Sequence, residues 1–176
     1  MIAYRHVDPR WPFLWEDPSQ PPGRWHGPGE GPVHYLSDTP DGAWAEFLRH
    51  EEITDPEDVP TIRRGMWAVE VPDETYPEPA LAEELLTGPP ESYPACQDEA
   101  RRIRGGGAPG LVAPSAALWP GGATGWRVDR GLMPGPSRDG RTVALFGRRP
   151  DLVGWAAAAE GHPGEDVLRR VRHFTA

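Results

Sequence analysis

The sequence predicts an α+β domain made of short strands and short helices that are joined by long loops. Runs of alternating polarity and runs with helical spacing both occur along the chain, and they indicate strands and helices respectively. Glycine (21) and proline (23) together make up a quarter of the residues, but they are scattered among apolar segments that carry eight tryptophans. That combination is typical of a loop-rich folded domain rather than of a disordered chain. A length of 176 residues suits one domain, so we expect residues 1–176 to form a single domain.

The first strand is expected at residues 1–7. Its alternation places Arg5 on the same side as small apolar residues, where a solvated charge is unusual. Residues 8–31 are rich in proline, glycine and tryptophan, and they predict a loop that is held by aromatic packing. A second short strand is expected at residues 32–37, and it carries Tyr35.

A helix is expected to begin at Pro40. Thr39 precedes it and is suited to cap the free N–H groups of the first turn, and proline is favoured at the first helical position. Apolar side chains recur at helical spacing after it and predict a buried stripe. These residues are Ala43, Trp44, Phe47 and Leu48. Glu46 lies on the flank of this stripe beside His50, so we expect it to border a cleft without being buried in the core.

The rest of the chain predicts further short elements and no internal repeat. Strands are expected at residues 66–71, 110–113, 142–146 and 153–158, and helices at residues 80–86 and 94–104. Residues 165–174 fit either a helix or a strand. The Gly/Pro-rich segment at residues 119–140 has no assigned function. Residues 135–140 within it are interpreted as a surface turn, because their spacing is one residue too long for a nucleophile elbow.

Charge and residue usage disfavour or exclude several classes of function. The formal net charge is -9 and the isoelectric point is about 5.1, which disfavours direct binding to a nucleic acid. All 18 basic residues are arginine, so lysine Schiff-base chemistry and a P-loop lysine are excluded. The glycine-rich residues 27–31 and 105–107 lack the spacing of phosphate-binding loops, and both are interpreted as turns.

Metal binding and membrane insertion are not expected. Cys96 is the only cysteine, which excludes an internal disulfide and a cysteine zinc cluster. The six histidines do not form a close metal-ligand spacing. We therefore expect no metal and no bound cofactor. No apolar stretch is long enough to cross a membrane, and the N-terminal residues lack the pattern of a signal peptide, so the expected location is the cytoplasm, without a membrane partner.

Five polar residues lie on otherwise apolar elements and are the candidates for a functional site. They are Arg5, Arg24, Tyr35, Glu46 and Ser115. Each of them alone is compatible with a structural role. An arginine pairs with an acid or stacks on a ring, a tyrosine packs in a core, a glutamate is solvated on a helix and a serine caps a turn. Their combination, together with its local context, is what indicates a function.

The contexts of these residues resemble the RES domain family. The matching motifs are Y-R in the first strand, G-R-W before a Gly/Pro loop, P-V-x-Y-x-S-x-T-P-x-x-A-x-x-E-x-x-x-H at residues 32–50 and P-S-A at residues 114–116. The family is named for an arginine, a glutamate and a serine, which match Arg5, Glu46 and Ser115. The resemblance covers most of the chain and is strongest at residues 23–50. The chain departs from the family where His26 replaces an asparagine after G-R-W, and where L-W-P-G-G-A-T-G-W replaces an asparagine-containing segment.

The resemblance implies an ADP-ribosyltransferase-like fold, with a split, twisted β core and short flanking helices. It also implies an enzyme that consumes NAD+ as its substrate, by phosphorolysis or hydrolysis of the nicotinamide–ribose bond. Inorganic phosphate or water is then the acceptor. Many members of the family act as toxins, so the partner that the resemblance implies is an Xre-like antitoxin protein. Two alternatives stay open: transfer of ADP-ribose to a macromolecule, although the chain has no E-x-E pair, and a non-catalytic NAD-binding module.

The chemistry of NAD+ gives each candidate a predicted role. The planar forks of Arg5 and Arg24 suit the pyrophosphate, and Tyr35 can stack on the nicotinamide ring. Glu46 can stabilise the positive charge that develops on the ribose. Ser115 is expected to hydrogen-bond near the reacting ribose or the acceptor. Arg5, Glu46 and Ser115 are therefore the predicted catalytic residues, and Arg5, Arg24, Tyr35 and Ser115 the predicted NAD+-binding residues.

Overall fold

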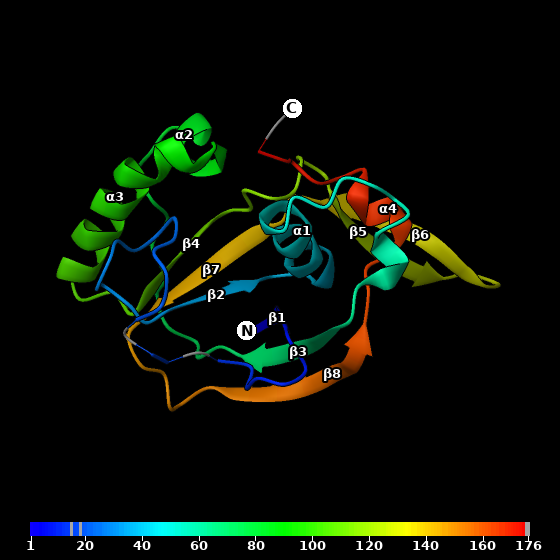
Figure 1. The fold of residues 1–176 in the computed structure, drawn as a ribbon, viewed down its shortest axis with the longest axis horizontal. Coiled ribbons are helices and arrows are strands. Elements are labelled where there is room, and N and C mark those ends of the chain that lie inside the picture. Colours follow the sequence, from blue (N-terminus) through cyan, green and yellow to red (C-terminus); the bar gives the residue numbers. More distant parts are fainter. Residues whose placement is uncertain (15, 18, 175–176) are drawn as a thin grey trace.

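The fold is given by a computed structural model that describes residues 1–14, 16–17 and 19–174 (Figure 1). Its strands are β1 (Ile2–Val7), β2 (Val33–Ser37), β3 (Arg64–Glu70), β4 (Gly110–Pro114), β5 (Ala123–Val128), β6 (Leu132–Arg138), β7 (Arg141–Phe146) and β8 (Val153–Gly161). Its helices are α1 (Pro40–His50), α2 (Glu83–Thr87), α3 (Tyr93–Gly105) and α4 (Glu165–Leu168), with 3-10 turns at Val59–Thr61 and Pro90–Ser92. This mixture of antiparallel strands and short helices confirms the predicted α+β class.

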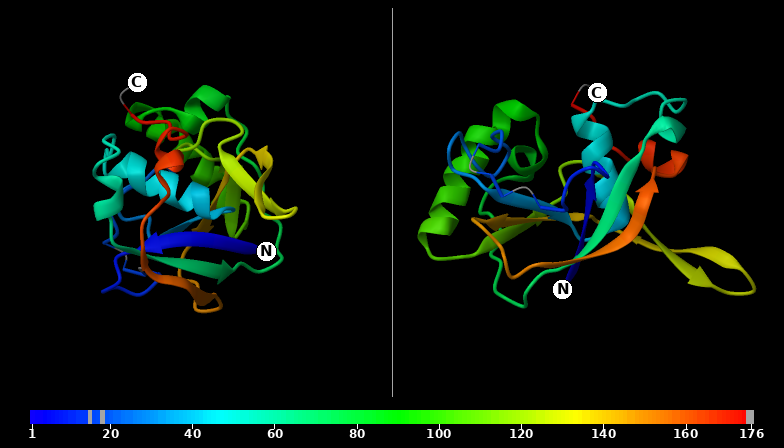
Figure 2. Two further views of the ribbon diagram at one scale, coloured as in Figure 1. Left: turned by 90° about the vertical axis from the view of Figure 1, so that its right-hand side faces the viewer. Right: turned by 60° about the horizontal axis from the view of Figure 1, so that its bottom comes forward.

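Six of these strands form one antiparallel sheet in the order β4-β7-β2-β1-β3-β8. Strand β2 pairs with β7 along its whole length, and β1 pairs with β3 along its whole length. Between β1 and β2, in contrast, a single residue pair is in register, Tyr4 with Ser37. The sheet therefore consists of two three-stranded halves that are joined at one point and diverge from it (Figure 2). This arrangement is the split β core that the family resemblance implies.

Helix α1 packs against β1 and α4 and carries the residues that border the split. Thr39 is extended, and its Oγ1 accepts a hydrogen bond from the Gly42 N–H at 3.1 Å, so it caps the helix as predicted. The predicted stripe of four apolar residues on this helix is buried. Residues three and four apart share a helix face, so Glu46 and His50 follow one another along the edge of that stripe.

Three clusters of buried apolar side chains hold the sheet and the helices together. The first lies under α1 and α4, and Tyr4 packs against it. The second joins α3 to β4 and includes Trp25, with Tyr35 packed against it. The third contains Ala3 of β1 and Leu36 of β2. Successive side chains of a strand point to opposite faces. Tyr4 therefore packs on the first cluster while its neighbour Ala3 belongs to the third, and Tyr35 packs on the second cluster while its neighbour Leu36 belongs to the third.

Residues 123–138 form a two-stranded hairpin that the sequence analysis does not predict. Strands β5 and β6 pair with each other and project from the body of the protein (Figure 2). The surface turn expected at residues 135–140 is wrong over most of its length, because β6 continues to Arg138. Pro134 and Pro136 disfavour a strand, but they are two residues apart and therefore share one edge of β6. In a two-stranded ribbon the outer edge needs no N–H donors, so prolines are tolerated there.

The other predicted elements occur with shifted ends. Helix α2 begins at Glu83 rather than at residue 80, since Ala82 before it is still extended, and the N–H of Ala80 donates to Oε1 of Glu99 at 2.8 Å. Residues 165–174, which fit helix or strand, contain the short helix α4 and then an isolated bridge between Val171 and Leu118. Among the helices in the described ranges, none has the length and apolar character needed to span a membrane.

Candidate active site

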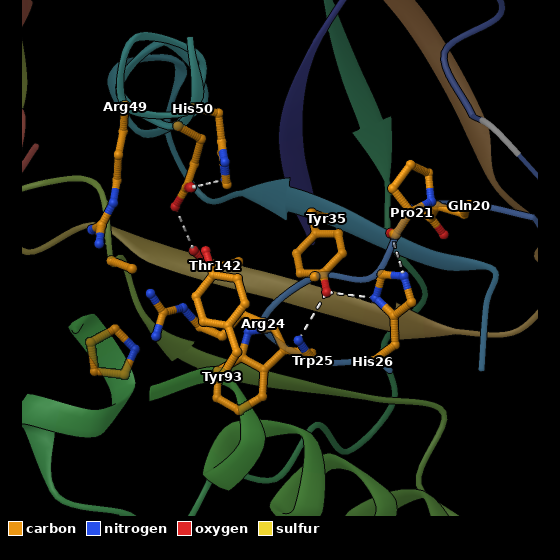
Figure 3. A pocket seen from close by; sticks show the side chains of 14 residues that line it. Gln20, Pro21, Arg24, Trp25, His26, Tyr35, Arg49, His50, Tyr93 and Thr142 are labelled. Carbon is orange, nitrogen blue, oxygen red and sulfur yellow. Dashed lines mark hydrogen bonds and ion pairs between the residues drawn. The ribbon is translucent and has the colours of Figure 1, made fainter. Parts of the chain in front are cut away.

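Two adjoining cavities lie next to α1 at the split in the sheet. The first, here called the loop cavity, has a volume of about 210 Å³ and is lined by the loop at residues 20–26, by α1 and by the start of α3 (Figure 3). The second, here called the strand cavity, has about the same volume, 210 Å³, and is lined by residues 4–6 of β1, residues 35–37 of β2 and α1. The residues shared by the two linings are Tyr35, Glu46, His50 and Thr142. A ligand that spans both cavities would therefore pass these four side chains.

Glu46 borders both cavities from α1. Its side chain is 22% exposed, which agrees with the predicted position on the flank of the helix. Oε1 lies 3.4 Å from the donor Oγ1 of Thr142, and Oε2 lies 3.6 Å from Nε2 of His50. Both distances are long for hydrogen bonds. The carboxylate therefore keeps acceptor capacity for a ligand.

Tyr35 stands in the middle of a hydrogen-bond chain that fixes the loop beside it (Figure 3). Its hydroxyl accepts a bond from the Trp25 N–H at 2.9 Å and lies 2.9 Å from Nδ1 of His26, whose Nε2 lies 3.0 Å from the Pro21 carbonyl. Every partner is satisfied when Tyr35 donates to Nδ1 and Nε2 carries the imidazole proton. Burial raises the pKa of Tyr35 and lowers the pKa of His26, so both are neutral at neutral pH. Tyr35 thus offers its ring, rather than its hydroxyl, to the cavities.

Arg24 is built into the wall of the loop cavity. Its side chain is buried, Nη2 donates to the Gly88 carbonyl at 2.6 Å, and Nη1 donates to the Leu85 carbonyl at 3.0 Å and to the Ser92 hydroxyl at 3.1 Å. The guanidinium also lies 4.7 Å from the centroid of the Tyr93 ring, a cation–π contact. A phosphate would have to displace some of these bonds. The phosphate contact of Arg24 therefore stays a prediction, and its observed contacts join the loop to α2 and α3.

Arg5 lines the strand cavity and forms no ion pair with the residues that the structure describes. The residue as a whole is half-buried, but its Nη1 atom is enclosed and has no hydrogen-bond partner in the part of the chain that the structure describes. Burial lowers the pKa of Arg5 to about 10, which leaves the guanidinium protonated at neutral pH. The adjacent His6 is neutral, because burial and then the charges of Arg64 and Arg5 lower the pKa of His6 to about 3. An enclosed, unpaired cation is costly, so the strand cavity favours an anionic ligand.

Ser115 directly follows β4 and is buried. Its Oγ accepts hydrogen bonds from the N–H groups of Ala117 and Leu118, both at 3.2 Å, which is a common local arrangement for serine. Its neighbours Pro114 and Ala116, rather than Ser115 itself, belong to the lining of the loop cavity. Among the described residues the hydroxyl accepts these two bonds and donates none. The predicted contact of Ser115 with the ribose or the acceptor stays a prediction.

Comparison with protein families identifies the family of the chain. The RES domain model matches residues 2–165. The chain belongs to the RES domain family. A curated relative of this RES domain is the protein named Toxin Res from Pseudomonas putida strain KT2440, which is 51% identical over 51 residues. That match covers 29% of this chain and 33% of the relative, so the chain matches about a third of the length of the curated toxin.

A solved structure extends the comparison to the whole fold. In the M. tuberculosis MbcT–MbcA toxin–antitoxin complex, one chain superposes on this RES domain with a TM-score of 0.63. The likeness covers 96% of this chain and 86% of that chain at 15% sequence identity. At this identity the likeness concerns the fold, and it supports the α+β architecture described above.

The RES domain also brings to the cavities several polar side chains that were not among the five candidates. They include His26, Arg49, His50, Tyr93 and Thr142. Arg49 has a signal in the sequence, because it follows Glu46 by three residues and so lies on the same flank of α1. The last two come from α3 and β7. Their approach to the helix depends on the packing of elements that are distant in sequence, so no local pattern predicts it.

Gly23→Ala is expected to destabilise the RES domain by about 1–3 kcal/mol. A Cβ atom at this position would lie 2.7 Å from the hydroxyl oxygen of Tyr35 and 3.2 Å from the ring of His26, so the loop has to move and the hydrogen-bond chain has to stretch. Urea unfolding followed by tryptophan fluorescence measures the effect. Gly105→Ala is the control, since a Cβ there meets nothing within 4 Å. Equal effects of the two substitutions would contradict the tight contact at Gly23.

Proposed function

We propose that this protein is an NAD+-degrading enzyme that cleaves the bond between nicotinamide and ribose. The observation that carries the proposal is the combination of Glu46, a carboxylate bordering both cavities, with Arg5, an enclosed cation that has no partner in the described chain. NAD+ offers a negatively charged pyrophosphate to an arginine. It also develops positive charge on the ribose during cleavage, which a carboxylate stabilises.

The proposed reaction begins when the bond between C1″ of the ribose and the nicotinamide nitrogen breaks. Both electrons of the bond leave with the nicotinamide, which departs as a neutral molecule. The ribose then carries oxocarbenium-like positive charge, and Glu46 stabilises it or accepts hydrogen bonds from the ribose hydroxyls. An oxygen of phosphate or water forms the new bond to C1″, and an attacking water also loses one proton. The second product is ADP-ribose 1″-phosphate or ADP-ribose.

The surrounding side chains have supporting roles in this proposal. Arg5 binds the pyrophosphate, and the ring of Tyr35 contacts the nicotinamide. Arg24 holds the loop in place through its bonds to α2 and to the turn before α3, and phosphate contact by this residue is a further part of the proposal. Ser115 donates its free hydroxyl proton toward the ribose or the acceptor.

The proposed biological role is that of a toxin that depletes NAD+. The support comes from two comparisons: the relative from P. putida is named a toxin, and the solved neighbour is part of a toxin–antitoxin complex. An Xre-like antitoxin protein is the partner that we propose for this chain. Because NAD+ is a metabolite of the cell interior, the proposed place of action is the cytoplasm.

One experiment tests the activity and separates its variants. The purified protein is incubated with NAD+ in the presence and absence of phosphate, and the products are identified by mass spectrometry. Phosphate-dependent release of nicotinamide indicates a phosphorylase, and phosphate-independent release indicates a glycohydrolase. Release that requires a macromolecular acceptor indicates an ADP-ribosyltransferase. A folded protein that binds NAD+ and turns it over under none of these conditions would be a non-catalytic binding module, and the proposal would be wrong.

A further inference from the structure

We infer that the RES domain has a second anion-binding site, which takes a phosphate group and lies beside α2, apart from the cavities at Glu46. The site is a cavity of about 450 Å³, here called the tail cavity, lined by Arg49, by α2 and the residues just after it, by Trp119 and by residues 172–174. The residue that it shares with the loop cavity is Arg49, and none of its lining residues belongs to the strand cavity.

Arg49 supplies the most deeply buried charge of the tail cavity. It is 2% exposed, and its Nη2 atom donates to the carbonyls of Thr87 at 3.2 Å and of Gly88 at 2.9 Å. Its Nε and Nη1 atoms are enclosed and have no hydrogen-bond partner among the described residues. The ring of Phe174 covers the guanidinium at 4.4 Å. Two donors of a buried cation are therefore left for a ligand.

Arg172 presents a second guanidinium to the same cavity. Its backbone N–H is fixed by a 2.7 Å bond to the Ala117 carbonyl, and its guanidinium stacks 4.8 Å from the centroid of the Trp119 ring. The Nε and Nη1 atoms of Arg172 and the Nδ1 atom of His173 are also enclosed without a partner in the described ranges. The stacking on Trp119 holds the guanidinium of Arg172 in one orientation, so the N–H donors of Arg172 are preorganised.

A third guanidinium increases the positive charge at this place. Arg24 and Arg49 donate to the same carbonyl oxygen, that of Gly88, so two cations approach one neutral acceptor. Burial lowers the pKa of both Arg49 and Arg172, attraction to Glu46 and Glu83 respectively offsets part of this effect, and repulsion from Arg24 adds a smaller lowering. The carboxylates of the cavity, Glu83 and Glu84, lie on exposed residues of α2. The buried part of the cavity is therefore cationic and its exposed part is acidic.

A phosphate group fits the chemistry of this site. Guanidinium forks donate in pairs to the oxygens of a phosphate, and an anion would offset the mutual repulsion of the arginines. The cavity has more volume than a free phosphate needs, and the side of Trp119 is partly open, with 47% of the residue exposed. The phosphate can therefore be inorganic phosphate or part of a nucleotide, and the experiment below distinguishes the two.

The test is a titration of isotope-labelled protein with inorganic phosphate, without NAD+ and at constant ionic strength set by chloride. The indole N–H signal of Trp119, assigned with Trp119→Phe, reports on the tail cavity by NMR. We expect a saturable shift in the wild type, and about tenfold weaker binding in Arg172→Gln because a charge-assisted interaction is lost. Arg172→Lys should bind with intermediate affinity, because it keeps the charge and loses the planar fork. Arg169→Gln, an exposed arginine nearby, is the matched control and should stay within twofold of the wild type.

A second titration uses ADP-ribose in place of phosphate. The Trp119 shift gives a dissociation constant for each compound. If this constant is lower for ADP-ribose than for phosphate, and Arg172→Gln raises it, the phosphate group of the natural ligand belongs to a nucleotide. If phosphate alone gives the Arg172-dependent shift, the ligand is free phosphate. The inference is overturned if neither compound gives a saturable shift, or if Arg169→Gln and Arg172→Gln weaken binding equally. Because NAD+ is not used, the outcome is independent of the proposed cleavage activity.

Discussion

Glu46→Gln is expected to slow the release of nicotinamide from NAD+ about 100- to 1,000-fold, the usual effect of removing one electrostatic contact to a transition state. Glutamine keeps the size of the side chain and one acceptor oxygen for Thr142, but it removes the negative charge that borders both cavities. The positive charge on the ribose exists only as the bond breaks. We therefore expect the dissociation constant of NAD+ to change by no more than a few-fold, while the rate constant of cleavage falls.

Single-turnover measurement of nicotinamide release, combined with calorimetric binding of NAD+, separates these two effects. Glu51→Gln is the matched control, because Glu51 is exposed at the C-terminal end of the same helix and the substitution makes the same change of charge. Its rate should equal that of the wild type. A Glu46→Gln protein that cleaves NAD+ at the wild-type rate would show that another group stabilises the ribose.

Arg5→Gln is expected to weaken NAD+ binding about 10- to 100-fold, because a charge-assisted contact to the pyrophosphate is lost in an enclosed site. The same substitution should leave the free energy of unfolding unchanged or raise it. The Nη1 atom of Arg5 is enclosed and has no partner within residues 1–14, 16–17 and 19–174, and an unpaired buried charge destabilises a fold. Loss of affinity without loss of stability is what distinguishes a ligand-binding arginine from a structural one.

Calorimetry in a Glu46→Gln background measures this affinity without consuming NAD+, and urea unfolding measures the stability. Arg148→Gln serves as the control, since Arg148 is exposed in the loop after β7 and carries the same charge. If Arg5→Gln unfolds more easily and binds NAD+ as tightly as the control, Arg5 is a structural residue and the proposed contact is wrong.

Elements that depend on local interactions could be predicted from the sequence. The start of α1 follows from Thr39 and Pro40, whose effects involve only the next few residues, and the buried stripe of this helix follows from its spacing. The hairpin β5–β6 could not be predicted, because Pro134 and Pro136 are compatible with a strand only when their edge of the strand has no neighbour. Whether an edge is covered is decided by the packing of the whole chain.

The sequence by itself determined which residues are candidates and which family they resemble, because each candidate stands in a short local motif: Y-R at Arg5, G-R-W at Arg24, the pattern at residues 32–50 and P-S-A at Ser115. Only the tertiary structure decided which of the arginines are available to a ligand. The guanidinium of Arg24 donates to the carbonyl of Gly88, 64 residues away. In the described chain, Nη1 of Arg5 and Nε and Nη1 of Arg49 have no hydrogen-bond partner. The physical reason is that the availability of a buried charge depends on which distant groups pack beside it, and neither helical spacing nor strand alternation carries that information.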